Sequence, residues 1–222
     1  MIRLVAFDMD GTLVDVDSSW GEVHRFFGDS NPEGLKAFME DRIDDAEFVR
    51  SDIRIWWRHQ PTISLAEVDR ILSSVPLMPG AAPLLARLRA RGATTAIISG
   101  GVDLLASRIA RTLGIDHVLA NGFATDAHGR LTGEGVIRVP IWGKEEVLEA
   151  LQAQLGIGPA ETASVGNSEI DEGLFRRSRI GVAFLPADDT IRRAATAVVE
   201  EKDLTRVLPH LLDPGAGERS PR

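Results

Sequence analysis

A short polar run after the first apolar stretch has residue types that can carry out nucleophilic, metal-binding or proton-transfer chemistry. Asp8 and Asp10 stand in the run DMDGT, which directly follows the apolar residues Ile2–Phe7. Two neighbouring carboxylates can take different roles, because their surroundings set them apart: one serves as a nucleophile or metal ligand, and the other carries a proton. The alternative interpretation is an ordinary turn, in which Asp-Gly is common.

A second polar cluster, Ser99-Gly100-Gly101, follows the predicted strand Thr94–Ile98. We expect a helix to begin here. Free backbone N–H groups at the start of a helix bind anions, and glycine lets a phosphate approach the backbone closely. The alternative is a helix cap joined to a flexible turn.

The third candidate is Lys144, in the first turn of the predicted helix Lys144–Leu155. A cation there opposes the helix dipole, at a cost of ~0.3–1 kcal/mol when it is exposed, and a bound anion would remove the conflict. The alternative is a solvated lysine whose charge is balanced by Glu145 and Glu146.

The fourth cluster, residues 166–171 (GNSEID), follows the predicted strand Ala163–Val165. Its oxygen-bearing side chains suit Mg2+, a hard cation that prefers carboxylates, carbonyls and water. The alternative is an ordinary strand-to-helix cap. Together the four clusters supply two aspartates, a hydroxyl, a lysine and an acidic loop, which are the groups needed for phosphoryl transfer through an aspartyl intermediate.

The elements around these clusters predict how they come together. From residue 80 onward, strand-like apolar runs alternate with helical runs. This alternation indicates an α/β fold with a Rossmann-like, mostly parallel sheet and helices on both faces. A small β-hairpin is predicted within residues 123–139. Such sheets bind ligands at the carboxyl ends of their strands, which is where we expect the four clusters to meet.

The stretch between the first two clusters has helical periodicity and helix-capping residues instead. Four helices are predicted in it, opened in turn by Ser18 or Ser19, Pro32, Asp44 or Asp45, and Ser64. The predicted domains are therefore an α/β core over residues 1–15 and 80–212 and an inserted α-helical cap over 16–79. The last residues, 213–222, are rich in glycine, proline and charge and are predicted to be a disordered tail.

Composition narrows the choice of function. The chain has 222 residues, with 25 Lys and Arg against 33 Asp and Glu, a formal net charge of −8. That balance argues against a nucleic-acid partner, because binding to phosphates needs cations. There are no cysteines, which excludes disulfides and thiolate catalysis and favours a cytoplasmic location. No apolar stretch approaches the ~18 residues of a membrane span, so no membrane partner is expected.

The four clusters, in this order and spacing, resemble the motifs of the haloacid dehalogenase-like hydrolases. The first motif is similar to residues 8–14 (DMDGTLV), the second to Ser99, the third to Lys144 and the fourth to residues 166–171. Residues 97–103 (IISGGVD) and the hairpin before Lys144 are most similar to the phosphoserine phosphatase branch. The resemblance covers nearly the whole chain, and it implies that the helical insert is the first type of cap found in this family.

The resemblance implies a role for each motif residue. Asp8 would attack the phosphorus and become an aspartyl phosphate, and Asp10 would protonate the leaving alcohol and then activate water. Lys144 would neutralise the charge of Asp8 and of the phosphate. The residues expected to bind the substrate beside Lys144 are Thr12, Asp17, Ser99 and Gly100. Mg2+ would be the cofactor, and its expected ligands are Asp8, Asp10, Asn167 and Asp171.

In the fourth motif, two positions depart from the family's pattern. Asn167 stands where the family usually has a metal-binding aspartate, so weaker Mg2+ binding is expected unless Asp171 compensates directly or through water. Ile170 stands where phosphoserine phosphatases commonly have an asparagine that touches the substrate.

A third departure concerns the cap, where phosphoserine phosphatases use a glutamate and an arginine to hold the amine and carboxylate of serine. Asp17 takes the position of the glutamate with a shorter side chain. Ile53 falls near the expected place of the arginine, with Arg50 and Arg54 on either side. These differences leave phosphatase chemistry in place but do not support specificity for serine.

We therefore predict a Mg2+-dependent phosphatase that hydrolyses a small phosphorylated metabolite, with phosphoserine as one candidate, and that acts as a monomer or homodimer. One alternative is phosphotransfer to a second small molecule, as in mutases with similar caps. Another is a weakly catalytic protein that binds a phosphorylated ligand, an interpretation motivated by Asn167.

Overall fold

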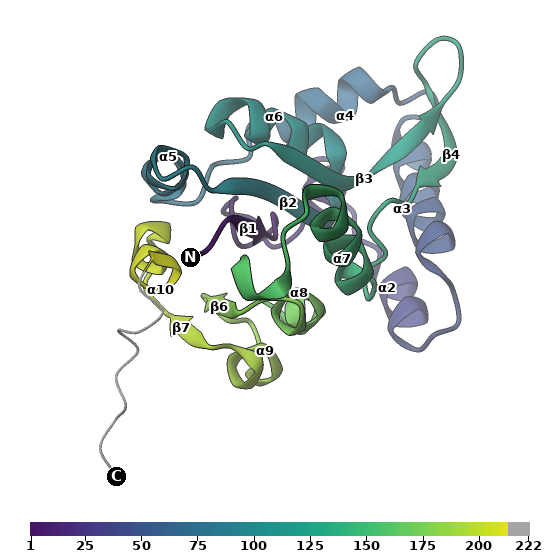
Figure 1. The fold of residues 1–222 in the computed structure, drawn as a ribbon. Helices are drawn as coiled ribbons and strands as arrows, with labels where there is room; N and C mark the ends of the chain where they lie inside the picture. The colour runs from purple at the N-terminus through teal and green to yellow at the C-terminus, as the bar shows by residue number, and fades with distance from the viewer. Residues whose placement is uncertain (213–222) are drawn as a thin grey trace.

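The computed structural model describes residues 1–212, and its centre is a seven-stranded sheet in the order β4-β3-β2-β1-β5-β6-β7 (Figure 1). Neighbouring strands pair in parallel, except β3 with β4, which are antiparallel. The strands are β1 (Leu4–Phe7), β2 (Thr94–Val102), β3 (His117–Thr125), β4 (Leu131–Val136), β5 (Thr162–Gly166), β6 (Ile180–Phe184) and β7 (Ala197–Val199). The predicted mostly parallel sheet and the hairpin are confirmed. The tail expected over 213–222 lies outside the described residues.

Helices cover both faces of the sheet, as predicted, because side chains alternate between the two faces along each strand. In β1, Val5 and Phe7 belong to one apolar cluster, while Leu4 and Ala6 belong to the other. Leucines of α5 (Ala81–Ala90) and α6 (Asp103–Leu113) join the first cluster, and those of α7 (Lys144–Leu155) and α8 (Glu172–Arg176) join the second. The remaining short helices after β4 are η1 (Pro159–Glu161), η2 (Glu169–Asp171), α9 (Asp189–Ala194), η3 (Leu204–Val207) and α10 (Leu208–Leu212).

The four helices expected between β1 and β2 are present: α1 (Ser19–Phe26), α2 (Pro32–Met39), α3 (Asp45–His59) and α4 (Leu65–Leu72). Ser18, Asn31, Asp44 and Ser64 each accept a hydrogen bond from a backbone N–H of the first turn. These bonds satisfy N–H groups that otherwise lack a partner, which explains where the helices begin. The division into a core and a cap at residues 16–79 stays a prediction, since one apolar cluster runs continuously from these helices into the sheet.

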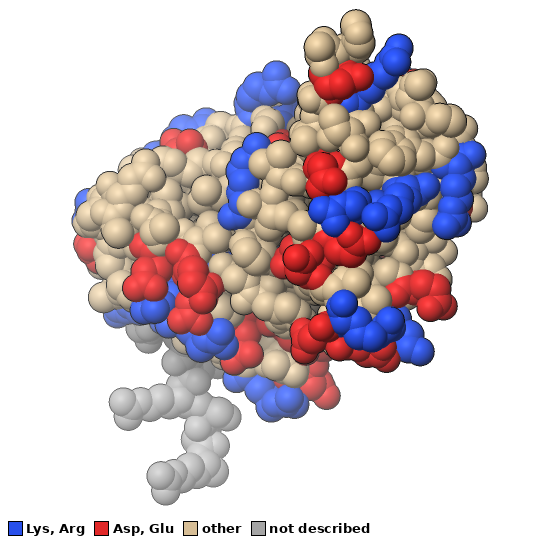
Figure 2. All heavy atoms as spheres, turned by 90° about the vertical axis from the view of Figure 1, so that its right-hand side faces the viewer, with Lys and Arg blue, Asp and Glu red and all other residues tan. Residues whose placement is uncertain are grey.

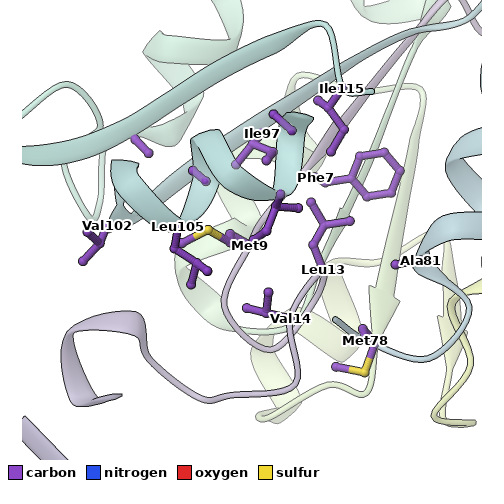
Figure 3. Packing of buried hydrophobic residues seen from close by; sticks show 14 of the residues in the cluster. Phe7, Met9, Leu13, Val14, Met78, Ala81, Ile97, Val102, Leu105 and Ile115 are labelled. Carbon is purple, nitrogen blue, oxygen red and sulfur yellow. The ribbon is translucent and has the colours of Figure 1, made fainter. Parts of the chain in front are cut away.

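The turn after β1 is held in place by its apolar residues. Met9, Leu13 and Val14 are fully buried and point into the same cluster as Leu105 of α6 (Figure 3). The carbonyl of Met9 also accepts hydrogen bonds from the backbone of Leu13 and Val14. Because Met9 is anchored in the core, the aspartates on either side of it are fixed at the end of the strand.

One expectation was wrong: no helix begins at Ser99-Gly100-Gly101. These residues continue β2, with a register shift against β3 between Ser99 and Val102, and α6 begins only at Asp103. The physical reason is that the backbone at Gly101 packs closely against the turn after β1. A Cβ at Gly101 would lie 2.5 Å from Met9 Cε and 2.8 Å from Asp10 Oδ2. The glycine therefore brings β2 against the turn after β1, rather than opening a helix.

Candidate active site

The candidate site is a cavity of about 670 Å³ at the carboxyl ends of the central strands. The strand order reverses direction at β1, which has β2 on one side and β5 on the other, and ligands bind at such a switch point in open α/β sheets. The predicted site residues that line the cavity are Asp8, Asp10, Asp17, Ser99, Gly100, Lys144 and Asn167. Thr12 and Asp171 lie outside its lining and are fully buried.

Lys144 connects the first and fourth motifs. Its ammonium nitrogen lies 2.8 Å from Oδ1 of Asp8 and 2.6 Å from Oδ1 of Asp171, and all three side chains are almost completely buried. Burial alone would lower the pKa of Lys144, but the charges of Asp171 and Asp8 outweigh burial and raise the pKa. The lysine is therefore a fixed cation beside Asp8, and the alternative of a solvated surface lysine is excluded.

Asp171 holds both the lysine and the loop of the fourth motif. Its Oδ1 accepts from Lys144, while its Oδ2 accepts from the backbone N–H groups of Asn167 and Ser168, at 2.9 and 3.2 Å. Burial raises the pKa of Asp171 above its ordinary value, and the charge of Asp8 adds to this. Because both oxygens are already engaged, Asp171 positions other groups of the site; its expected contact with a metal stays a prediction.

The carboxyl group of Asp10 differs from that of Asp8 in its partners. Oδ2 accepts from both the backbone N–H and the hydroxyl of Ser19, each at 2.8 Å, while Oδ1 is buried without a hydrogen-bond partner among the described residues. Burial raises the pKa of Asp10 to about 7; the Ser19 bonds oppose this rise and the charge of Asp8 adds to it. At neutral pH this group can both give and take a proton, as a general acid–base requires.

Ser99 and Gly100 of β2 line the cavity together with Asp8. The Ser99 hydroxyl oxygen accepts from the backbone N–H of Gly101 at 3.2 Å, and the residue is buried. Its O–H hydrogen is then free to donate to a ligand oxygen, since a hydroxyl can donate and accept at once.

Of the other predicted residues, Asn167 lies directly against the turn after β1. A side chain at Gly11, where φ is +72°, would collide with the Asn167 amide nitrogen, so this glycine allows the loop of the fourth motif to close onto the first. Asp17 lines the cavity and is exposed. The Thr12 hydroxyl is buried with no hydrogen-bond partner among the described residues, and Thr12 is not part of the cavity lining, so its expected substrate contact stays a prediction.

The oxygen atoms near Asp8 suit a hard cation, but acidic side chains alone do not supply enough ligands to hold it. Within residues 1–212, no group of three or more His, Cys, Asp or Glu side chains is arranged to hold a metal ion. Among the described residues, the Asp8 side chain forms a hydrogen bond only through Oδ1, to Lys144, so Oδ2 is left for another ligand; Asn167, which lines the same cavity, carries an amide oxygen. A cation here would bind to mixed charged and neutral oxygens, with water completing its coordination, as Mg2+ prefers.

Two positioning residues were not predicted. Ser19 was considered only as a helix cap, yet its hydroxyl also accepts from the backbone N–H of Val102 and so joins α1 to the end of β2. Asn121, buried at the cavity, donates to the carbonyls of Gly100 and Val139 and accepts from the backbone of Arg138 and Val139. The available signal for Asn121 was a polar residue following the apolar run Val118–Ala120.

The fold and the site together define a hydrolase class. A family model described as haloacid dehalogenase-like hydrolase matches residues 5–176, and the chain belongs to this family. Phosphoserine phosphatase of Wolinella succinogenes is 31% identical over 213 residues, which are 95% of this chain and 100% of the relative. The phosphoserine phosphatase of Methanocaldococcus jannaschii is 26% identical and covers 94% of this chain and 97% of its own length.

Solved structures give the same result. A phospho-aspartyl intermediate analogue of phosphoserine phosphatase is 25% identical, covers 95% of this chain and 99% of that chain, and has a TM-score of 0.79. A substrate-bound phosphoserine phosphatase complex, 24% identical with the same coverage, shares the fold with a TM-score of 0.80. The predicted membership in the phosphoserine phosphatase-like branch, a branch of phosphatases acting on phosphoric monoesters, is confirmed.

Proposed function

We propose that this protein is a Mg2+-dependent phosphatase that hydrolyses a small phosphomonoester through an aspartyl phosphate on Asp8. The observation that carries the proposal is the buried contact of Asp8 with Lys144, beside a second aspartate whose pKa is raised to about 7. One carboxylate is in direct contact with a fixed cation, and the other can exchange a proton. This division of roles is what a two-step displacement at phosphorus needs.

In the first step, an oxygen of Asp8 forms a bond to phosphorus while the bond from phosphorus to the alcohol oxygen breaks. Asp10 gives its proton to that oxygen, so that a neutral alcohol leaves. In the second step, Asp10 takes a proton from water, and the resulting hydroxide attacks the phosphorus and releases phosphate from Asp8. Ser19 keeps Asp10 in position by binding Oδ2, which leaves Oδ1 for the proton.

The other residues stabilise charge. The Ser99 hydroxyl is placed to donate to a phosphoryl oxygen, and Lys144 offsets the repulsion between Asp8 and the incoming phosphate. Mg2+, when bound by the Asp8 carboxylate, the Asp10 backbone carbonyl and Asn167, would supply further positive charge at the phosphoryl group.

The size of the cavity supports a small substrate, because pockets of ~300–1,000 Å³ are typical for small molecules. Phosphoserine, the substrate in the names of the relatives, is one candidate. Among the described residues, no helix has the length and apolar character needed to cross a membrane. A cytoplasmic location and a monomeric or homodimeric state belong to the same proposal.

The test measures phosphate release from p-nitrophenyl phosphate and small alkyl phosphates, with and without Mg2+. We expect Mg2+-dependent turnover that is lost in Asp8→Asn, and a phosphorylated Asp8 peptide in acid-quenched wild-type protein. Retained activity in Asp8→Asn would refute the mechanism. Phosphate transferred to an added alcohol instead of water would support a phosphotransferase, and tight binding without turnover would support a binding protein.

A further inference from the structure

In the part of the cavity beyond the phosphate end, the described lining residues include acidic side chains but no free cation. Its titratable lining residues there are Asp17, Asp45, Asp52 and His24. In the described part of the chain, no arginine lines the cavity, and Lys144, its lone lysine, is held by two carboxylates. A substrate with a carboxylate in its leaving group would find no positive partner here.

The arginines that flank Ile53 do not supply a positive charge to this part of the cavity. Arg50 pairs with Glu47 and with Glu134 of β4, the latter at 2.8 Å, and Arg54 pairs with Glu47 at 2.8 Å. Neither arginine lines the cavity. On the side of the molecule that carries α3 and β4, basic and acidic side chains lie next to one another on the surface (Figure 2). Ile53 itself is fully buried in the apolar cluster.

Asp52, the neighbour of Ile53 in α3, is a buried carboxylate with neutral partners. Its exposed fraction is 3%, and its Oδ1 lies 2.8 Å from Nε2 of His24 and 2.7 Å from Nδ2 of Asn31. Trp56 donates its indole N–H to Nδ1 of His24 at 3.1 Å. An indole nitrogen can only donate, so Nδ1 of His24 carries no proton, and the ring is the neutral tautomer that donates from Nε2.

The negative charge of Asp52 is therefore without a positive partner in the described chain. Buried carboxylates are normally paired with a cation, because burying an isolated charge is costly. Both neutral donors bind Oδ1, while Oδ2 makes no hydrogen bond to a described residue and, unlike Oδ1 of Asp10, is not enclosed by protein. Since Asp52 lines the cavity, Oδ2 is open to a ligand there.

An aromatic side chain at the cavity wall also favours a positively charged ligand group. Trp20 lines the cavity, donates its indole N–H to the carbonyl of Gly100 at 3.0 Å, and stacks on Trp56 with ring centroids 6.0 Å apart. These contacts fix the ring at the cavity wall. The face of an indole attracts cations, and it does so more strongly when the cation is removed from water.

We propose that the substrate is the phosphate monoester of an amino alcohol with a positively charged nitrogen and no carboxylate, and that Asp52 binds this nitrogen. The inference rests on the proposed phosphatase function and deepens it. The leaving alcohol extends from the phosphate at Asp8 into the acidic part of the cavity. There its ammonium group supplies the charge that Asp52 lacks.

The test compares ω-aminoalkyl phosphates of increasing chain length with n-alkyl phosphates of equal length, and phosphoethanolamine with phosphoserine, which differs only by a carboxylate. At the best chain length we expect kcat/KM for the amine to exceed that for the alkyl phosphate by about tenfold or more, as for one hydrogen bond to a buried charge. We also expect phosphoethanolamine to be a better substrate than phosphoserine. Equal rates for amine and alkyl phosphates at every length, or a preference for phosphoserine, would overturn the proposal.

A variant assigns the effect to Asp52. Asp52→Asn keeps the shape and can still accept from His24 and Asn31, but it removes the charge. We expect the ratio of kcat/KM between amine and alkyl phosphates to fall toward one, whereas a purely structural role would lower both rates equally and leave the ratio unchanged. Asp41→Asn is the matched control, because Asp41 is an exposed residue of the same insert outside the cavity. If Asp52→Asn does not fold, the ratio of kcat/KM between amine and alkyl phosphates in the wild type still tests whether the cavity prefers a cationic leaving group.

A binding measurement tests the preference for amines independently of the proposed phosphatase activity. Calorimetric titration of Asp8→Asn protein with the same pairs of phosphates measures the preference without turnover. Absence of Asp8-dependent phosphate release from every ester, p-nitrophenyl phosphate included, would refute the phosphatase function. Turnover of p-nitrophenyl phosphate without any preference for amines, in rate or in binding, would refute the role of Asp52 alone.

Discussion

Ser19 donates two hydrogen bonds to a single oxygen of Asp10, from its backbone N–H and from its hydroxyl, both at 2.8 Å. The same hydroxyl accepts from the backbone N–H of Val102 at 3.0 Å. One serine of α1 thus joins Asp10 to the end of β2. The position and the pKa of Asp10 therefore depend on a residue of α1.

Ser19→Ala is predicted to move the pH profile. The Ser19 hydroxyl bond lowers the pKa of Asp10 against the larger opposite effect of burial, so its removal raises that pKa. In the proposed mechanism Asp10 must be protonated to release the alcohol, and we therefore expect the alkaline decline of kcat/KM to shift to higher pH in the variant. The wild type measured with the same alkyl phosphate is the reference, which cancels the titration of the substrate. An unshifted decline would show that Ser19 does not influence the titrating group.

Asp10→Asn is predicted to inactivate the protein and to stabilise it at alkaline pH. The pKa of Asp10 is about 7 in the folded protein against 3.8 in the unfolded chain. Stability contributed by the protonated group is complete below pH 3.8 and is lost as the pH rises to about 7. The loss is up to about 4 kcal/mol, at 1.36 kcal/mol per pKa unit. An uncharged Asn avoids this loss.

Urea unfolding in the presence of a chelator measures the difference. The free energy of unfolding of Asp10→Asn should exceed that of the wild type at pH 8 and match it near pH 4. A constant difference across this range would contradict the raised pKa.

The parts of the site that could be predicted are those marked by local sequence. Asp8 and Lys144 each stand at the boundary of a clear strand or helix, and parallel strands bring such boundaries to one edge of the sheet. Their contact at 2.8 Å joins residues 136 positions apart, and the resemblance of the motifs to those of the family already implied it. Asp52 could not be found in this way. It lies within the helical pattern of α3, and its importance depends on partners in α1 and in the loop before α2.

The Ser99-Gly100-Gly101 cluster shows a different limit of sequence reasoning. Glycines before a predicted helix are compatible with a helix cap and a flexible turn as well as with an anion site. The deciding fact is the closeness of Met9, Asp10 and Ser19 to Gly101, and this depends on tertiary packing of segments far apart in the chain. Local pattern therefore placed the residues in the site but misplaced the start of the helix.

Gly101→Ala tests that close approach. Its Cβ would lie 2.5 Å from Met9 Cε and 2.8 Å from both Asp10 Oδ2 and Ser19 Oγ. We expect a loss of about 1–3 kcal/mol in the free energy of unfolding, which is typical of overpacking, and a lower kcat because Asp10 is displaced. Gly158→Ala is the control, since a Cβ there would meet no atom within 4 Å. Equal behaviour of the two variants would argue against tight packing at Gly101.

Lys144→Met is predicted to destabilise the protein strongly. It leaves the buried carboxylates of Asp8 and Asp171 without their cation, and breaking a buried ion pair in this way costs about 3–5 kcal/mol. Burial already raises the pKa of Asp171, and removing the lysine raises it further, so protonation at low pH relieves the repulsion. The loss should therefore be larger at pH 8 than at pH 5 in urea unfolding.

A double-mutant cycle with Asp171→Asn tests whether the loss of stability in Lys144→Met comes from the ion pair between Lys144 and Asp171. With the second carboxylate neutralised, Lys144→Met should cost less than in the wild type, which gives a coupling energy between the two positions. Additive effects of the two substitutions would mean that Lys144 stabilises the fold by packing rather than by charge.

Asn167→Asp is predicted to lower the Mg2+ concentration needed for activity. The substitution replaces a neutral amide oxygen by a carboxylate beside Gly11, at the wall of the cavity that Asp8 also lines, and Mg2+ prefers carboxylate ligands. Without metal, the added charge repels Asp8, so the variant should melt at a lower temperature than the wild type in a chelator and gain more on addition of Mg2+. This metal-dependent shift in melting temperature is a readout that does not require turnover. A Mg2+ requirement that is unchanged or higher in the variant would mean that Asn167 does not limit metal binding.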